Sequence, residues 1–202
     1  MDIRDKDGLT ESEFLAQYRP GDYPHPSLTV DIVLFASDSR DDSDRVRVLL
    51  IQRGGHPCLG SWALPGGFVE PKEDVETAVA RELAEETGIT GIACEQLGVY
   101  SAPGRDPRGW TVSAAFIASL DQLPIAQAGD DAADALWCPI RVRKHDDGTY
   151  KMQVEAGDKL LHCQFEERAA RFMPARAQVL SAHGFAFDHA QIVADAWLAT
   201  HK

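Results

Sequence analysis

The chain has 202 residues, which is enough for one domain with its own core. It carries 32 acidic and 20 basic side chains, so its net charge is −12. A nucleic-acid binder usually shows a basic stripe, and none is present here, so we expect no nucleic-acid partner. No stretch approaches the roughly 18 apolar residues that span a bilayer, and residues 1–8 lack the apolar core of an export signal. We therefore expect a cytoplasmic protein without a membrane partner.

The four cysteines lie far apart in the sequence and form no CxxC pair, so the spacing does not indicate a zinc site. In the cytosol such residues are small hydrophobic side chains that stay reduced. We expect this role for all of them: Cys58, Cys94, Cys138 and Cys163.

A short helix is expected over residues 10–18, because Thr10 is followed three positions later by Glu13, the pattern of a capping box. We treat residues 1–22 as an N-terminal extension of the domain. The apolar side chains of the helix are expected to dock on the body of the protein: Phe14, Leu15 and Tyr18.

Strands are expected where apolar and β-branched residues run together, first at 27–36 and then at 45–52. A brief strand at 61–64 leads into a Pro-Gly-Gly turn. Further strands are expected at 93–100, 110–119 and 135–139, a hairpin at 150–154 and 159–165, and a final helix at 188–199.

The spacing of apolar residues changes to a helical period between residues 74 and 87. Asp74 suits the N-cap of this helix, and Gly88 suits the position just after its last turn. The residues of the apolar stripe are Val75, Ala78, Val79 and Leu83.

Glu82, Glu85 and Glu86 stand at i, i+3 and i+4, so their carboxylates share one face of this helix, almost opposite the apolar stripe. Like charges at this spacing raise one another's pKa, and a divalent cation relieves the repulsion. Mg²⁺ prefers carboxylate oxygens and bridges to phosphates. The pattern therefore indicates a Mg²⁺ site, with Mn²⁺ as a substitute; the alternative is an acidic face in solvent.

Residues 67–89 read GFVEPKEDVETAVARELAEETGI and contain every signature position of the Nudix box. The chain therefore resembles the Nudix hydrolase superfamily. The resemblance implies an α/β fold, an α/β/α sandwich with a mixed β-sheet, here with an added β-hairpin. We expect a single domain over 1–202, with the hairpin inside an insertion at 141–183. The signature positions are Gly67, Glu73, Arg81, Glu82, Leu83, Glu85, Glu86, Gly88 and Ile89.

The same resemblance implies roles for the box residues. The backbone carbonyl of Gly66 joins the carboxylates as a metal ligand. Arg81 and Glu73 hold the loop against the helix and support catalysis, in which Glu85 takes part as well. The ligand set implied for the metal is Glu82, Glu85, Glu86 and Gly66.

A base outside the helix is expected in the loop 129–131, because Nudix enzymes often place an acid before a later strand. Asp131 is the predicted base or additional ligand, and Asp130 is the second choice. The alternative is a loop that is polar only for solubility.

Segments outside the box resemble those of bacterial ADP-ribose pyrophosphatases and of Nudix-like repressors of NAD metabolism, among them 23–35, 60–70, 103–109 and 185–193. The substrate implied is a small nucleotide, ADP-ribose, cleaved to AMP and ribose 5-phosphate. Nucleoside triphosphates, NADH and dinucleoside polyphosphates stay open. A protein that only senses ADP-ribose would not need the acidic triad, and the short stretch after the last helix leaves no expected room for a DNA-binding module.

Substrate contacts are expected from Arg105 and Arg108, which share one loop and can grip a diphosphate in a fork geometry, and from Arg53. The alternative is that the loop arginines are exposed and pair with Asp106. Four aromatic residues are candidates either for stacking on adenine or for the core, and Phe68 is the one assigned to the substrate. The candidates are Trp62, Phe68, Tyr100 and Trp110.

His189 follows Asp188 at the start of the last helix, and for it we favour packing or capping over catalysis. The hairpin at 150–165 needs a partner surface, because two strands alone are marginal in water. That surface is either the same chain or a two-fold copy, and we expect a homodimer. The apolar residues concerned are Tyr150, Met152, Leu161, Cys163 and Phe165.

Overall fold

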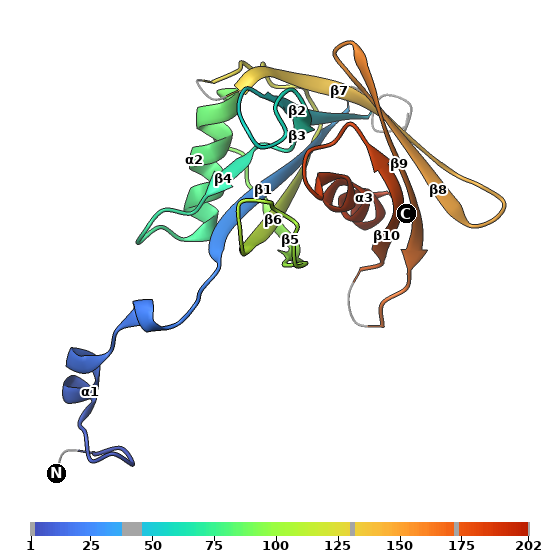
Figure 1. The fold of residues 1–202 in the computed structure, drawn as a ribbon. Helices are drawn as coiled ribbons and strands as arrows, with labels where there is room; N and C mark the ends of the chain where they lie inside the picture. Colours follow the sequence, from blue (N-terminus) through green and yellow to red (C-terminus); the bar gives the residue numbers. More distant parts are fainter. Residues whose placement is uncertain (1–2, 38–45, 130–131, 172–173, 202) are drawn as a thin grey trace.

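A ten-stranded mixed sheet forms the frame of the protein, and the computed structural model describes it over residues 3–37, 46–129, 132–171 and 174–201 (Figure 1). Its main path runs β10-β9-β8-β7-β2-β1-β6-β5, while β3 pairs with β2 and β4 pairs with β1. The pair β1–β6 is parallel and the others are antiparallel. The strands are β1 (Ser27–Ala36), β2 (Arg47–Arg53), β3 (Trp62–Ala63), β4 (Gly66–Phe68), β5 (Glu95–Tyr100), β6 (Thr111–Leu120), β7 (Ala132–Lys144), β8 (Thr149–Ala156), β9 (Lys159–Arg168) and β10 (Arg176–His183).

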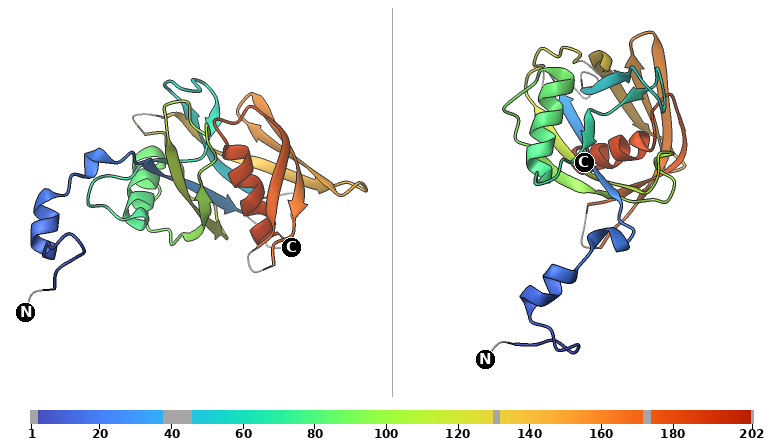
Figure 2. Two further views of the ribbon diagram at one scale, coloured as in Figure 1. Left: turned by 60° about the horizontal axis from the view of Figure 1, so that its bottom comes forward. Right: turned by 60° about the vertical axis from the view of Figure 1, so that its left-hand side comes forward.

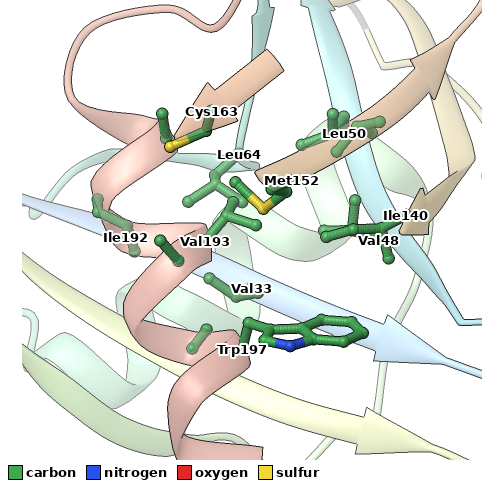
Figure 3. Close-up of a cluster of buried hydrophobic side chains, with 14 of the residues drawn as sticks. Val33, Val48, Leu50, Leu64, Ile140, Met152, Cys163, Ile192, Val193 and Trp197 are labelled. Carbon is green, nitrogen blue, oxygen red and sulfur yellow. The ribbon is translucent and has the colours of Figure 1, made fainter. Parts of the chain in front are cut away.

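Helices α2 (Val75–Thr87) and α3 (His189–Thr200) cover the two faces of the sheet, which confirms the α/β/α sandwich (Figures 1 and 2). The side chains of β1 alternate between the two faces. Val30 and Ile32 pack with the apolar stripe of α2, whereas Val33 packs with α3 in the larger core, part of which Figure 3 shows. Because both faces of β1 are buried, its sequence is an almost continuous apolar run.

The caps predicted for α2 are confirmed. The Asp74 side chain accepts a hydrogen bond from the backbone N–H of Thr77, and Gly88 ends the helix in the left-handed conformation, at φ 70°. Among the helices of the described residues, none is long and apolar enough to cross a membrane. The four cysteines are free thiols, with Cys138 and Cys163 buried.

Strand β7 is much longer than the strand predicted at 135–139. Its first part pairs with β2 and its last five residues pair with β8, so one strand carries the sheet from the body into the hairpin. The predicted hairpin is present as β8 and β9. Strand β10 was not predicted; it adds a further antiparallel strand, and the sheet curls around α3 (Figure 1).

The hairpin packs on the body of its own chain. Four of the five apolar side chains named for it are at most 1% exposed and belong to the core that surrounds α3. The fifth, Tyr150, stacks on Phe165 with 5.0 Å between ring centres. Packing therefore does not require a second copy, and the reason for expecting a homodimer was wrong. The homodimer itself stays a prediction.

Helix α1 (Glu11–Gln17) begins with the predicted capping box, in which Thr10 and Glu13 exchange hydrogen bonds. The expected docking of its apolar side chains was wrong: no residue of α1 is buried, and the helix stands clear of the body (Figures 1 and 2). Its aromatic residues find partners within the extension instead. The Tyr18 ring lies 5.7 Å from that of Phe14 and 5.8 Å from that of Tyr23, beyond the short 3-10 helix η1 (Pro20–Asp22).

Candidate active site

Strand β4 and the loop after it join the sheet to α2, and the strand lies tightly against its neighbours at two glycines. A side chain at Gly66, whose φ is 154°, would collide with the backbone carbonyl of Val30 on β1. One at Gly67 would collide with the carboxylate of Glu82. The backbone N–H of Gly66 donates to Glu86 Oε2 at 2.8 Å. Glycine at these two positions therefore brings the β4 backbone directly onto the acidic face of the helix.

Arg81 connects this loop to the acidic face. Its guanidinium forms a two-pronged pair with Glu73, at 2.9 and 3.0 Å, and also donates to the backbone carbonyl of Phe68 at 3.0 Å. Its Nη1 donates to Glu82 at 2.8 Å and to Glu85 at 3.0 Å. These bonds, above all the one to Glu73, raise the pKa of Arg81 further above its ordinary value. Arg81 thus stays charged and sets the positions of two carboxylates.

The carboxylates differ in their surroundings. Burial raises the pKa of Glu82, with Arg81 opposing that shift, and it raises the pKa of Glu86 to about 8. Glu85 is mostly exposed. A cation next to these groups would favour their charged forms.

The donor set fits a hard cation, because it consists of oxygens alone. In the part of the chain that the structure describes, however, no three acidic, histidine or cysteine side chains already converge on one point. Glu82 and Glu85 turn toward Arg81, whereas Glu86 turns toward the Gly66 N–H. Metal binding by all three therefore requires side-chain rotation at the helix face.

A cavity of about 700 Å³ opens beside the acidic face. Glu82 and Glu86 line it on the α2 side. Several of the residues that the sequence assigns to substrate binding also line it, together with Phe187, which was not predicted. These are Arg53, Phe68, Arg105 and Arg108.

Arg105 is engaged inside the protein. Only 4% of its side chain is exposed, and its guanidinium pairs with Asp188 at 2.7 and 2.9 Å and with Asp31 at 3.2 Å. Asp31 also accepts a 2.6 Å hydrogen bond from the hydroxyl of Ser113. The guanidinium of Arg105 therefore holds its loop against β1 and the start of α3. The alternative, that Arg105 is an exposed turn residue, was wrong. Asp31 was not predicted as a site residue, although a charged residue within a buried apolar strand is itself a signal.

His189 packs in the same network. Its Nδ1 accepts the backbone N–H of Leu64 at 2.8 Å, and its Nε2 lies 3.4 Å from Asp31 Oδ1. Burial lowers the pKa of the imidazole, although Asp31 opposes the shift. Both ring nitrogens thus have partners within the chain, which agrees with a packing role.

Arg108 makes the pair with Asp106 that was the alternative to substrate binding, through bonds of 2.7 to 3.1 Å. Its guanidinium also lies over two rings, 4.9 Å from the centre of Phe68 and 5.6 Å from that of Phe187. Arg53 lies over Phe187 at 5.1 Å. Two guanidinium groups and two phenylalanine rings thus alternate along one side of the cavity.

Of the four aromatic candidates, Phe68 alone lines the cavity. Trp62 and Tyr100 are core residues, and Trp110 is 59% exposed at the surface. The predicted base, Asp131, and its alternative, Asp130, lie outside the described residues. The residue before them, Gly129, donates its N–H to the carbonyl of Glu86 at 3.1 Å.

The sequence of the chain is similar to those of two proteins that are named for ADP-ribose. The chain is 45% identical over 113 residues to an ADP-ribose pyrophosphatase of Methanocaldococcus jannaschii, covering 56% of this chain and 62% of that protein. It is 40% identical over 114 residues to the ADPR responsive transcriptional repressor NtrR of Acinetobacter baylyi, covering 55% of this chain and 44% of that one. The chain thus spans about half the length of these relatives.

Two solved structures resemble the fold. A MutT/nudix family protein from Enterococcus faecalis has a TM-score of 0.72 and 36% identity over 94% of this chain and 68% of that one. The NUDIX domain of Shewanella oneidensis NrtR, crystallised with ADP ribose, has a TM-score of 0.58 and 39% identity over 65% of this chain and 84% of that one. The NUDIX domain model matches residues 25–151, and the chain belongs to the Nudix family.

Proposed function

We propose that this chain is a Nudix pyrophosphohydrolase that uses Mg²⁺, or Mn²⁺ in its place, to cleave ADP-ribose into AMP and ribose 5-phosphate. The observation that carries the proposal is the acidic face of α2, set in place by Arg81 and open to a cavity whose other wall bears arginines and phenylalanines. A relative that is named an ADP-ribose pyrophosphatase and a similar NUDIX domain crystallised with ADP ribose support the choice of substrate.

In this proposal Glu82, Glu85, Glu86 and the carbonyl of Gly66 hold the metal. When bound, the metal supplies a polarised water and neutralises charge on the diphosphate. The protein positions the carboxylates that hold the metal. Arg81, fixed by Glu73, orients Glu82 and Glu85, while the N–H of Gly66 orients Glu86.

We assign the base to Asp131, with Asp130 as the second choice, and the proton of the attacking water passes to this carboxylate. In such phosphoryl chemistry, positioning and charge neutralisation supply most of the catalysis. The assignment is supported by the neighbouring Gly129, whose N–H reaches the carbonyl of Glu86 in the last turn of α2.

Arg53 is the proposed phosphate contact. Its Nε donates to the carbonyl of Pro57 at 2.8 Å, and no other hydrogen bond of its guanidinium is found among the described residues. The remaining N–H groups therefore point to a phosphate as their partner. Arg108 is a weaker candidate because its Nε and Nη2 are taken by Asp106. Arg105 stays a predicted substrate contact; it lines the cavity, although its guanidinium is paired with Asp188 and Asp31.

The second candidate function is ADP-ribose sensing without cleavage. It is favoured by one observation, namely that the relative from Acinetobacter baylyi is a transcriptional repressor that responds to ADPR. A panel of ADP-ribose, NADH, nucleoside triphosphates and dinucleoside polyphosphates, assayed with Mg²⁺ and Mn²⁺, separates these functions. We expect ADP-ribose to be cleaved fastest and to yield AMP. Binding of ADP-ribose without product would favour sensing, and a far higher rate on nucleoside triphosphates would overturn the substrate.

A further inference from the structure

One wall of the cavity is built as an alternating stack. In order, its members are Phe68, Arg108, Phe187 and Arg53, with guanidinium-to-ring distances of 4.9, 5.6 and 5.1 Å. Each distance lies within the roughly 6 Å over which a cation and a ring attract each other. All four residues line the cavity. We call this set the stacked wall.

Phe187, one of the two rings of the stacked wall, has an unusual backbone conformation. Its φ is 49°, which bulky side chains rarely adopt. The residue before it is fixed, because the backbone N–H of the buried Ala186 donates to the carbonyl of Trp62 at 2.8 Å. Backbone outliers of this kind concentrate at ligand-binding sites.

Arg108 contributes its flat face rather than its donors. Its Nε and Nη2 are engaged by Asp106, which is buried, so the guanidinium is held where its carbon lies 4.9 Å from the centre of the Phe68 ring and 5.6 Å from that of Phe187. A phosphate group would prefer donors that have no partner yet. The end of the wall formed by Phe68 and Arg108 therefore fits a flat, aromatic ligand group better than an anion, whereas Arg53 at the other end is the proposed phosphate contact.

Phe68 is the end of the stack that remains accessible. The residue is 45% exposed although it lines a cavity of otherwise mostly polar and charged side chains. It stands two positions after Gly66 in β4, its backbone carbonyl accepts from Arg81 of α2 at 3.0 Å, and it lines the same cavity as Glu82 and Glu86. A nucleotide whose phosphates lie at that face has its base within reach of this ring.

We propose that the stacked wall binds the base of the nucleotide, which adds one more layer on the exposed face of Phe68. The inference rests on the proposed function and deepens it, because it assigns the base to β4 and the diphosphate to α2 and Arg53. Stacking accepts any base, since each has a π-face. The wall thus selects nucleotides over phosphate esters that lack a base, without selecting strongly among bases.

Calorimetric binding of AMP and of ribose 5-phosphate, in buffer with Mg²⁺, tests the wall directly. The variants are Phe68→Leu and Phe187→Leu, which keep an apolar side chain and lose the flat ring. We expect Phe68→Leu to bind AMP about tenfold more weakly, in the range for losing one aromatic stack. Phe187→Leu removes a ring that contacts Arg108 and not the base, so it should weaken AMP binding less. Both variants should bind ribose 5-phosphate as the wild type does. Phe68→Tyr should restore AMP binding.

Trp110→Leu is the matched control, because Trp110 is an exposed aromatic residue that does not line the cavity. Equal weakening of both ligands, unchanged AMP binding by Phe68→Leu, or no AMP binding by the wild type would each overturn the proposal. These results are distinct from failure of the proposed function: a protein that binds AMP through these rings but does not cleave ADP-ribose keeps the stacked wall and loses the activity.

Discussion

Arg176 on β10 and Tyr100 on β5 lie 4.8 Å apart, measured from the guanidinium carbon to the ring centre, although their strands are the two ends of the sheet. Asp195 of α3 joins them, because it accepts the Tyr100 hydroxyl at 2.7 Å and Arg176 Nε at 3.0 Å. The sheet therefore wraps around α3 until its two edges meet. Strands β8, β9 and β10 complete this wrap around α3, the helix that begins two residues after Phe187.

We expect Tyr100→Phe to lower the free energy of unfolding by about 1.5–3 kcal/mol, the usual contribution of a hydrogen bond to a charged group. Asp195 keeps its other donors, among them the N–H of Ala177 at 2.6 Å, so the fold should persist. Chemical denaturation measures the change. Tyr150→Phe is the control, since that hydroxyl bonds to Glu167 at the surface and should contribute little. An equal loss in both variants would contradict a special role for the buried contact.

Arg81→Lys keeps the positive charge but cannot make the two-pronged pair with Glu73 and reach Glu82, Glu85 and the carbonyl of Phe68 at once. We expect kcat to fall by about a hundredfold, as is common for losing an electrostatic support. A higher Mg²⁺ concentration should be needed for half-maximal rate. Steady-state kinetics over a Mg²⁺ series checks both, and near-normal values would show that charge alone suffices.

The buried His189 makes stability depend on pH. Burial lowers its pKa from 6.5, so below about pH 6.5 the unfolded chain binds a proton that the folded chain resists. The contribution of the neutral ring is complete above that pH and is lost as the pH falls through the interval between the two pKa values. Its nearest charged partner is Asp31, with Asp188, Arg105 and Arg53 more remote.

We therefore expect the urea midpoint of the wild type to fall more between about pH 7.5 and about pH 5.5 than that of His189→Gln, which does not titrate. The Gln amide oxygen can still accept the Leu64 N–H. Parallel pH profiles of the two proteins would show that His189 does not carry this dependence.

Removal of residues 1–18 tests whether the N-terminal extension supports the domain. No residue of α1 is buried, so we expect the melting temperature and the rate of ADP-ribose cleavage to stay as in the full chain. Thermal unfolding followed by circular dichroism gives the first quantity. A clear loss of stability would mean that α1 covers a surface of this chain or of a second copy.

The sequence predicted those elements in which the apolar residues follow one clear pattern. Strand β1 was predicted to the residue, because both of its faces are buried, and α2 was predicted with both caps. Strand β10 was missed, since RAQVLSAH alternates weakly and half of it is exposed. The length of β7 was missed because Pro139 and a run of charged residues interrupt its apolar pattern.

The residues of the candidate site likewise fall into those that the sequence predicts and those that it does not. The acidic face follows from helical spacing, so the proximity of Glu82, Glu85 and Glu86 to Arg81 could be predicted. The stacked wall could not, because Phe68 and Phe187 are more than a hundred positions apart and meet through Arg108 from a third segment. Nor does spacing reveal that the Arg105 side chain is buried, since that depends on Asp31 and Asp188 reaching it from β1 and the start of α3.

The most direct test of the central claim is the rate of AMP release from ADP-ribose in the wild type, Glu86→Gln and Glu76→Gln, with Mg²⁺ and with a chelator. The proposed function predicts release by the wild type that stops with the chelator and returns with excess Mg²⁺. Glu86→Gln should be slower by at least about a hundredfold. Glu76→Gln, an exposed change in the first turn of the same helix, should match the wild type. Near-normal release by Glu86→Gln, or full release with the chelator present, would contradict it.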